Sequence, residues 1–282
     1  MSVRRVAVLL ALAGALAAPL SACGSKHPKP PVAAANTPAP ASGDAAMEAS
    51  PAGSVPPASP PPSGIPTITY TKAATGLPAD PDQSSMTLLN EGLQVDSKLP
   101  VYDAPGGQAR AYLTRQISGV DLIMPVVERR DGWVAVLLPS VNRSIGWLPA
   151  GGWKTRPLHD QIVVHRGAFK LTWLRDGAAQ QTWTVTVGAP ATQTPLGRTF
   201  VLGRSSLPSK VYAGLDVIAL GAVPDDKNAV AEGLADAHTG IHAWYQNDFG
   251  YRKSNGCVRM PPAAQKVLLD NIPSGTSVIV LP

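Results

Sequence analysis

The chain has 282 residues, 44% of them hydrophobic, which is enough for one large domain or two small domains with a buried core. Its formal charge is +5, and its Lys and Arg residues form no cluster. A nucleic-acid binder usually carries a basic stripe with aromatic residues nearby, so no nucleic-acid partner is expected. The weak positive balance suits work beside an anionic polymer, such as a cell wall or a lipid surface.

Residues 1–22 predict a signal peptide. Two arginines precede an apolar, alanine-rich run over residues 6–20, which is too short to span a bilayer comfortably. The run ends in Leu-Ser-Ala-Cys at residues 20–23, which resembles the lipobox of bacterial lipoproteins. That resemblance implies a lipid on Cys23, an exported protein and a membrane anchor facing the cell wall. An ordinary secretory leader in which Cys23 is incidental is the alternative.

Residues 23–84 are expected to form a disordered tether. The first part, residues 23–66, contains 12 of the 29 prolines, together with Ala, Ser and Gly, and shows no hydrophobic period. Such a segment cannot bury enough apolar surface to order itself, and proline keeps it extended. It would hold the folded part of the protein away from a membrane.

Residues 85–155 predict a small β-barrel, because short apolar strands alternate with turns. The Asp-Gly-Trp turn at 131–133 and the Gly-Trp-Leu strand at 146–148 resemble those of bacterial SH3-like domains. That family commonly binds wall peptides or packs on a catalytic partner. The strands are expected over residues 98–102, 110–113, 122–128, 133–138 and 145–148.

Residues 158–282 predict a second unit that is again mainly β, with one or two short helices. An Arg-Asp-Gly turn at 175–177 joins two alternating strands into a hairpin. Two prolines at 261–262 favour the start of a helix over 263–269. The remaining strands are expected at 162–164, 200–202, 240–243 and 275–281.

The two cysteines direct attention to Cys257. If Cys23 is lipidated, no disulfide forms, and Cys257 is the only free thiol of an exported chain. Oxidising compartments make free thiols a liability, so a retained one is more often chemical than structural. A buried, inert cysteine is the alternative.

A cysteine needs a base, a cation or a helix N-terminus to become a useful nucleophile. Gly256 precedes Cys257 and lets the backbone turn sharply, while Arg259 adds positive charge close by. His242 follows an apolar residue and precedes the loop that leads to the cysteine, which makes it the candidate base. One Cys and one His fall short of any zinc spacing, so neither a metal nor a cofactor is expected.

The sequence Ser-Asn-Gly-Cys-Val-Arg-Met at 254–260, with Ile-His at 241–242, resembles the signature of L,D-transpeptidases with the YkuD-type catalytic domain. Gly188, the Thr-Pro-Leu-Gly run at 194–197 and the terminal strand at 274–280 show the same resemblance. It implies a mixed β-sandwich and a peptidoglycan substrate. Carbapenem-type β-lactams are then expected to be covalent inhibitors.

The resemblance also implies a reaction. The Cys257 thiolate attacks the carbonyl of the third residue of a tetrapeptide stem and expels the terminal D-Ala. A side-chain amine of a neighbouring stem then resolves the thioester and gives a 3→3 cross-link. Carried over residue by residue, His242 is the base and the backbone carbonyl of Ala243 orients its ring.

The resemblance gives the other residues supporting roles. The N–H groups of Asn255, Gly256 and Cys257 form the oxyanion hole, and Ser254 supports the loop. Arg259 organises the pocket or meets a carboxylate. The substrate groove is lined by three further residues, Trp244, Tyr251 and Arg252.

One position departs from the family pattern, which usually has His where this chain has Asn255. A backbone N–H donor survives that change, so acylation is expected to survive, whereas acceptor recognition or rate is in doubt.

Two other functions remain open. A hydrolase or attachment-editing enzyme would use the same residues, and a non-catalytic wall-binding lipoprotein would require an inactive site.

Overall fold

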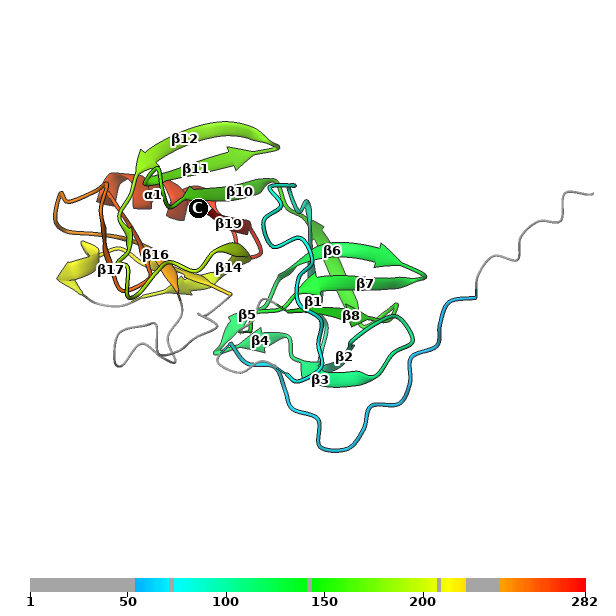
Figure 1. Cartoon of the computed structure of the whole chain (residues 1–282). Coiled ribbons are helices and arrows are strands. Elements are labelled where there is room, and N and C mark those ends of the chain that lie inside the picture. The colour runs from blue at the N-terminus through cyan, green and yellow to red at the C-terminus, as the bar shows by residue number, and fades with distance from the viewer. Residues whose placement is uncertain (1–53, 71–73, 141–143, 207–208, 222–238) are drawn as a thin grey trace, which may run out of the picture. The chain divides into compact units, whose positions relative to one another are not determined.

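The computed structural model describes residues 54–70, 74–140, 144–206, 209–221 and 239–282, and all of them belong to one compact unit (Figure 1). The fold is mainly β, as expected. Within these ranges no helix is long and apolar enough to cross a bilayer. The expected signal peptide, Cys23 and the first part of the tether lie outside the described residues.

The first sheet has seven strands in the order β3-β2-β8-β7-β6-β1-β9. The short pair β4 and β5 forms a separate hairpin. Every strand expected before residue 150 is present, and the sequence missed four: the β4–β5 hairpin, and β1 and β9, which pair with each other at one end of the sheet. The bounds are β1 Glu91–Val95, β2 Leu99–Tyr102, β3 Ala109–Leu113, β4 Gln116–Ile117, β5 Val120–Asp121, β6 Met124–Arg130, β7 Trp133–Leu137, β8 Ile145–Leu148 and β9 Trp153–Pro157.

The second sheet has eight strands in the order β12-β11-β10-β19-β14-β15-β16-β18. Strands β13 and β17 form a separate two-stranded parallel sheet. The bounds are β10 Asp160–His165, β11 Lys170–Arg175, β12 Ala178–Thr184, β13 Val187–Gly188, β14 Gly197–Ser205, β15 Val217–Leu220, β16 Gly240–Ala243, β17 Arg252–Ser254, β18 Val258–Met260 and β19 Ser277–Leu281.

Both Asp-Gly turns predicted from the sequence close hairpins. Asp131 and Gly132 join β6 to β7, and Asp176 and Gly177 join β11 to β12. All four residues have positive φ angles, between 50° and 79°. Two-residue hairpin turns whose central residues both have positive φ match the right-handed twist of the strands, which explains the preference for Asp-Gly at these sites.

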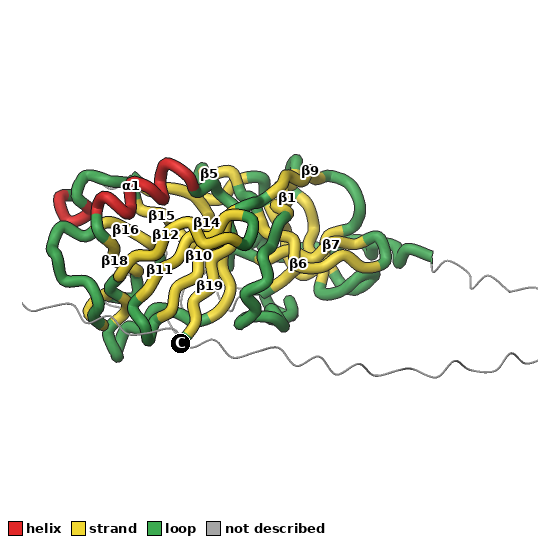
Figure 2. The backbone as a smooth tube through the Cα atoms, turned by 90° about the horizontal axis from the view of Figure 1, so that it is seen from above, coloured by secondary structure: helices red, strands yellow, loops and turns green. Residues whose placement is uncertain are grey.

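The second sheet folds around its own hydrophobic core. Its buried residues come from strands on both sides of β14 and from helix α1, Pro262–Asn271, with Leu268 fully buried. A proline at the first helical position is favoured because its missing N–H would have no partner there, so the sequence predicted this helix correctly. Figure 2 shows α1 lying alongside β16.

Strand β14 contributes side chains to two cores. Val201 belongs to the core of the second sheet, whereas Phe200 and Leu202 belong to the cluster formed by the first sheet. Side chains of successive strand residues point to opposite faces, so one strand serves both clusters. The two units expected on either side of residue 158 therefore share hydrophobic surface.

The part of the expected tether that is described lies against the first sheet. We call residues 54–70 and 74–87 the strap. The carbonyl of Pro56 accepts a hydrogen bond from Trp133 Nε1 at 2.9 Å, and that of Ser59 accepts one from the Tyr102 hydroxyl at 2.8 Å. Proline-rich chain offers free carbonyl groups, and the sheet supplies the donors. Composition alone therefore gave no sign of this ordered segment.

The strap also reaches the second sheet. Asp80 pairs with Arg198 of β14 through two hydrogen bonds, at 2.5 and 2.8 Å. Their side chains are 0% and 6% exposed, so the ion pair is buried. Two guanidinium nitrogens of Arg198 donate to the two oxygens of one carboxylate, a bidentate arrangement that fixes geometry as well as charge.

Candidate active site

The pairing of β16 with β18 determines which side chains meet. The two strands run parallel, and His242 is paired with Arg259. Their neighbours Ile241 and Val258 point into the core of the second sheet. Because side chains alternate along a strand, His242 and Arg259 share the opposite face. Cys257 immediately precedes β18 and is close enough to interact with the Gly240 backbone and with the charge of Arg259.

The ring of His242 is held in one orientation. Its Nδ1 lies 2.7 Å from the carbonyl oxygen of Ala243. A carbonyl oxygen only accepts hydrogen bonds, so Nδ1 carries the proton and the lone pair of Nε2 is left for another group. The ring is buried, with the rings of Tyr212 and Trp244 edge-on to it at centroid distances of 4.7 and 6.1 Å.

The electrostatics of this face keep both reacting groups neutral at rest. Burial is the main cause that lowers the pKa of His242 to about 4. The hydrogen bond to Ala243 raises this pKa, and the positive charge of Arg259 lowers it further. Burial also raises the pKa of the Cys257 thiol, against a backbone hydrogen bond from Gly240 and the charge of Arg259. A protonated thiol becomes a nucleophile only when a base removes its proton, and a neutral imidazole can be that base.

The turn before Cys257 is closed by Ser254. Its hydroxyl donates to the carbonyl oxygen of Cys257 at 2.5 Å and accepts the N–H of Gly256 at 3.2 Å. Gly256 has a φ of 110°, a region that side chains rarely allow. Ser254 and Gly256 thus fix the backbone that carries the cysteine, although the Gly256 N–H is directed at Ser254 in this conformation.

A second loop supports the turn. The Thr192 hydroxyl and the Ala189 N–H both donate to the carbonyl oxygen of Ser254 at 2.9 Å. Gly188 donates its N–H to the Thr194 hydroxyl at 2.9 Å. A Cβ on Gly188 would lie 2.2 Å from the Thr192 oxygen, so only glycine fits there. The family-like glycine and Thr-Pro run of the sequence therefore act as a brace under the cysteine turn.

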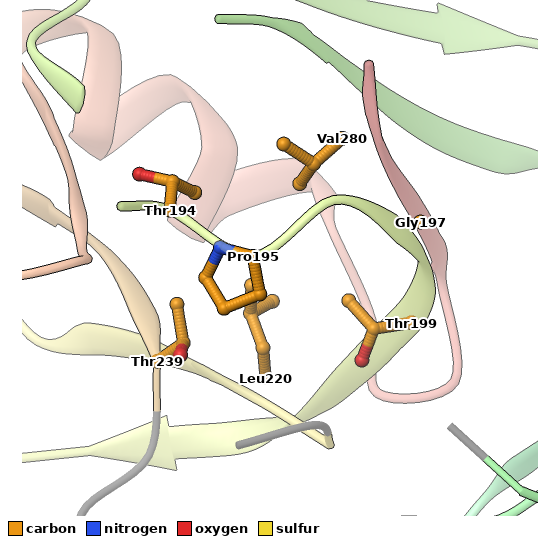
Figure 3. A pocket seen from close by; sticks show the side chains of 7 residues that line it. All are labelled: Thr194, Pro195, Gly197, Thr199, Leu220, Thr239 and Val280. Atoms are coloured by element: carbon orange, nitrogen blue, oxygen red, sulfur yellow. The ribbon is translucent and has the colours of Figure 1, made fainter. Parts of the chain in front are cut away.

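Behind this brace lies a small internal cavity, which Figure 3 shows beneath Thr194 and Pro195. Its volume is about 10 Å³, close to the minimum that one water molecule needs. Thr199 lines it, and the Thr199 hydroxyl oxygen is buried without a hydrogen-bond partner among the described residues. The cavity suits a single structural water rather than a substrate.

The residues expected to line the groove separate into two places. Trp244 lies at the centre, between the His242 ring and the Arg259 guanidinium, which sits 3.6 Å from the Trp244 ring centroid. Tyr251 is exposed and has the Lys253 ammonium 4.6 Å above its ring. Arg252 is exposed and lies 5.8 Å from the ring of Phe169.

Sequence reasoning missed three residues beside this face. Tyr212 belongs to the short 3₁₀ turn η2, Lys210–Tyr212, and Tyr245 packs its ring 5.0 Å from that of Trp244. Asp248 acts electrostatically on Arg259. All three lie outside the strands and the α-helix, so no hydrophobic period in the sequence pointed to them. The aromatic rings of Tyr212 and Tyr245 were the only feature that could have drawn attention to them.

The comparison with known families agrees with this arrangement. Residues 159–280 match the model of the YkuD family, the L,D-transpeptidase catalytic domain. This segment is similar to L,D-transpeptidase catalytic domains. No curated protein matches the chain.

Several solved L,D-transpeptidases resemble the structure. A mutant of the Enterococcus faecium enzyme has 19% identity and a TM-score of 0.34, over 44% of this chain and 50% of that one. The Mycobacterium smegmatis enzyme has 15% identity and a TM-score of 0.34, over 56% of this chain and 77% of that one. L,D-transpeptidase 3 from Mycobacterium tuberculosis, in complex with a faropenem-derived adduct, has 14% identity and a TM-score of 0.36. The match covers 50% of this chain and 74% of that one. The chain thus spans about half of the enterococcal enzyme.

Within the part of the chain that the structure describes, no three His, Cys, Asp or Glu side chains come together as metal ligands. Cys257 is a free thiol there. The matched segment therefore offers a free thiol, an oriented imidazole, a braced turn and an arginine stacked on a tryptophan.

Proposed function

We propose that the protein is a peptidoglycan L,D-transpeptidase that forms 3→3 cross-links, with Cys257 as nucleophile and His242 as its base. The observation that carries the proposal is the fixed His242 ring, whose Nδ1 is bound to the Ala243 carbonyl. This leaves Nε2 available for another group, and Cys257 lies two residues before Arg259, the strand partner of His242. The family match of residues 159–280 supports the substrate class.

In the first step, Nε2 of His242 takes the thiol proton as the Cys257 sulfur attacks the carbonyl carbon of the third stem residue. The carbon–sulfur bond of a thioester forms, and the amide bond to the terminal D-Ala breaks. The proton passes from His242 to the departing amine. Backbone N–H groups of Asn255, Gly256 and Cys257 would stabilise the oxyanion, which requires Gly256 to exchange its bond to Ser254.

In the second step, a side-chain amine of a neighbouring stem attacks the thioester carbonyl. The new amide bond forms, the carbon–sulfur bond breaks, and the amine proton returns to the sulfur through His242. Asn255 is exposed and offers a backbone donor as a histidine would. A side-chain contribution from that position is absent, so the second step is where this enzyme would differ in rate or acceptor.

Intact-mass measurement after incubation with a carbapenem tests the nucleophile. We expect a single covalent adduct on the wild-type protein and none on Cys257→Ala. No adduct on the wild type at millimolar drug would favour the non-catalytic wall-binding lipoprotein.

Digestion of tetrapeptide-bearing muropeptides separates transfer from hydrolysis. A transpeptidase gives dimers joined through the third residues, which mass spectrometry identifies. Free tripeptide without any dimer would favour the hydrolase, and exchange of the terminal group would favour the attachment-editing enzyme.

The N-terminal features complete the proposal. Cleavage after residue 22 and lipidation of Cys23 would place the enzyme on the membrane, facing the wall, with the SH3-like region 85–155 beside the catalytic domain. Metabolic labelling with a fatty-acid analogue tests this. The label should be lost in Cys23→Ser, and a labelled Cys23→Ser protein would contradict the anchor.

A further inference from the structure

The start of the strap, residues 54–62, contacts the first sheet at positions three residues apart, and we call these residues the proline segment. Pro56 and Ser59 are partly buried, whereas the residues on either side of each are exposed. The carbonyl oxygens of the same two residues accept the hydrogen bonds from Trp133 and Tyr102. A polyproline II chain has three residues per turn, so one edge of such a chain presents this pair. The contacts therefore have the period of a proline-rich ligand and not the two-residue period of a strand.

The two donors form one aromatic surface. The rings of Tyr102 and Trp133 meet edge to face with their centroids 5.0 Å apart, and both side chains are only 2% exposed. Buried Tyr and Trp side chains need partners for their polar atoms, and here the proline segment supplies them. Proline has no N–H group, so a proline-rich segment has carbonyl oxygens to spare. Aromatic-lined grooves are a recurring means of binding such segments.

A glycine turn forms one side of this surface. A Cβ on Gly106 would lie 2.7 Å from the Cβ of Pro56, so the proline ring approaches the turn as closely as glycine allows. The Ser59 hydroxyl donates to the carbonyl oxygen of Gly107 at 2.7 Å. The surface thus contacts side chains of the proline segment as well as its backbone. Such contacts give it a preference for sequence.

We propose that the surface around Tyr102 and Trp133 is a binding site for proline-rich peptide, and that the proline segment occupies it as a releasable intramolecular ligand. The chain is held separately beyond this segment, because Thr67 forms a β-bridge with Tyr112. Release would free roughly 30 Å of extended chain between the site and that bridge. The inference is independent of the proposed reaction.

The first test vacates the site in the full chain and offers the segment back as a free peptide. Pro56→Gly with Ser59→Gly removes the ring contact and the hydroxyl, and it lets the segment leave its extended conformation. The probe is the fluorescein-labelled peptide Ser-Val-Pro-Pro-Ala-Ser-Pro-Pro-Pro, and anisotropy measures its binding. We expect this variant to bind it at least ~10-fold more tightly than the wild type, whose own segment competes at an effective concentration of about 1 mM.

The matched control moves the same change one residue along the chain. Pro57 and Pro60 are exposed, so Pro57→Gly with Pro60→Gly adds flexibility while leaving the two contact positions intact. This variant should bind the peptide as weakly as the wild type. Equal binding by the two glycine variants would contradict the contacts at positions 56 and 59.

The second test removes the donors from the vacated chain. Trp133→Phe and Tyr102→Phe each keep a ring but lose one hydrogen bond, so each should weaken peptide binding by roughly fivefold. Trp153→Phe is the control, because Trp153 Nε1 donates at 2.8 Å to the carbonyl of Pro149, outside the proline segment. It should leave binding unchanged. A vacated chain that unfolds cooperatively on heating but binds no peptide would overturn the site, as would donor variants without effect.

A measurement on the wild type decides the question if the vacated chain does not fold. Hydrogen exchange at Trp133 Nε1, followed by NMR, reports release of the proline segment. Trp173 Nε1 is the reference, because its bond to Asp160 at 2.7 Å is buried in the second sheet and opens only on unfolding. We expect Trp133 to exchange at least ~10-fold faster than Trp173, since release needs no unfolding. Equal rates would show that the segment leaves only when the protein unfolds, and they would overturn the proposal.

Discussion

The Nδ1 atom of His242 lies 2.7 Å from the carbonyl oxygen of Ala243, the next residue in the chain. A strand residue thus orients its own neighbour, and no separate carboxylate is needed to hold the ring. Because the orienting group is a neutral carbonyl, it favours a charged imidazole only weakly, and burial determines the outcome. The pKa of His242 is therefore lowered to about 4.

The first prediction concerns the pH dependence of acylation. The reacting form has a neutral imidazole and a protonated thiol, so the rate of carbapenem adduct formation should be level between about pH 5 and pH 8. It should fall as pH drops through about 4, where His242 becomes protonated. An acid limb centred near the ordinary histidine value would contradict the buried, neutral ring.

The second prediction concerns stability. The folded protein binds a proton on His242 less readily than the unfolded chain, so stability is complete above pH 6.5 and falls as pH decreases towards 4. The loss should approach about 3 kcal/mol, because each pKa unit corresponds to about 1.4 kcal/mol. Urea unfolding at several pH values measures it. His242→Phe should show a shallower pH slope, and an unchanged slope would contradict the assignment.

The third prediction concerns the cysteine turn. Ser254→Ala removes both the bond to the Cys257 carbonyl and the acceptor of the Gly256 N–H. Acylation should slow by roughly tenfold and stability should fall by about 1–2 kcal/mol. Ser277→Ala is the control, because the Ser277 hydroxyl is buried with no partner among the described residues. Equal effects of the two variants would show that Ser254 has no special role.

The fourth prediction concerns the brace. Gly188→Ala places a methyl group 2.2 Å from the Thr192 oxygen, so the loop must shift and the turn loses its support. Carbapenem acylation should fall sharply and the melting temperature should drop, by the several degrees that about 2 kcal/mol produces. Gly167→Ala meets nothing closer than 3.5 Å and should behave as wild type. Normal acylation by Gly188→Ala would contradict the brace.

The fifth prediction concerns the strap. Asp80→Asn leaves the buried Arg198 with only the exposed Asp82 carboxylate, 3.9 Å away, as a counter-ion, which should cost about 3 kcal/mol. The exposed pair between Glu91 and Arg129 is the matched control, and Glu91→Gln should cost less than about 1 kcal/mol. Equilibrium unfolding measures both. A small effect of Asp80→Asn would mean that the strap is dispensable for stability.

Sequence reasoning succeeded where local chemistry determines the structure. The Asp-Gly hairpins, the proline-started helix and the cysteine turn each depend on a few adjacent residues. Strands β1 and β9 have weak patterns of their own and depend on pairing, β9 with β1 and β1 with both β9 and β6. Sequence reasoning missed the ordered strap because the side chains that donate hydrogen bonds to it, Trp133 and Tyr102, are distant in sequence.

The site divides in the same way. A short signature was enough to single out Cys257 and His242, and their catalytic roles stay predictions. Tyr212 and Asp248 could not be singled out in this way, because their segments have no periodicity and their positions depend on how the chain returns to the sheet. The roles of Asn255, Tyr251 and Arg252 stay predictions.

The contribution of β14 to both cores affects how this protein can be divided. Phe200 and Leu202 are buried in the cluster of the first sheet although they belong to the catalytic segment. A fragment that begins near residue 158 would expose this pair to water, at a cost of roughly 1.5–3 kcal/mol for each side chain, and would tend to self-associate. The first sheet is therefore not an interchangeable cassette, and any chimera that replaces it must supply a new apolar cover for β14.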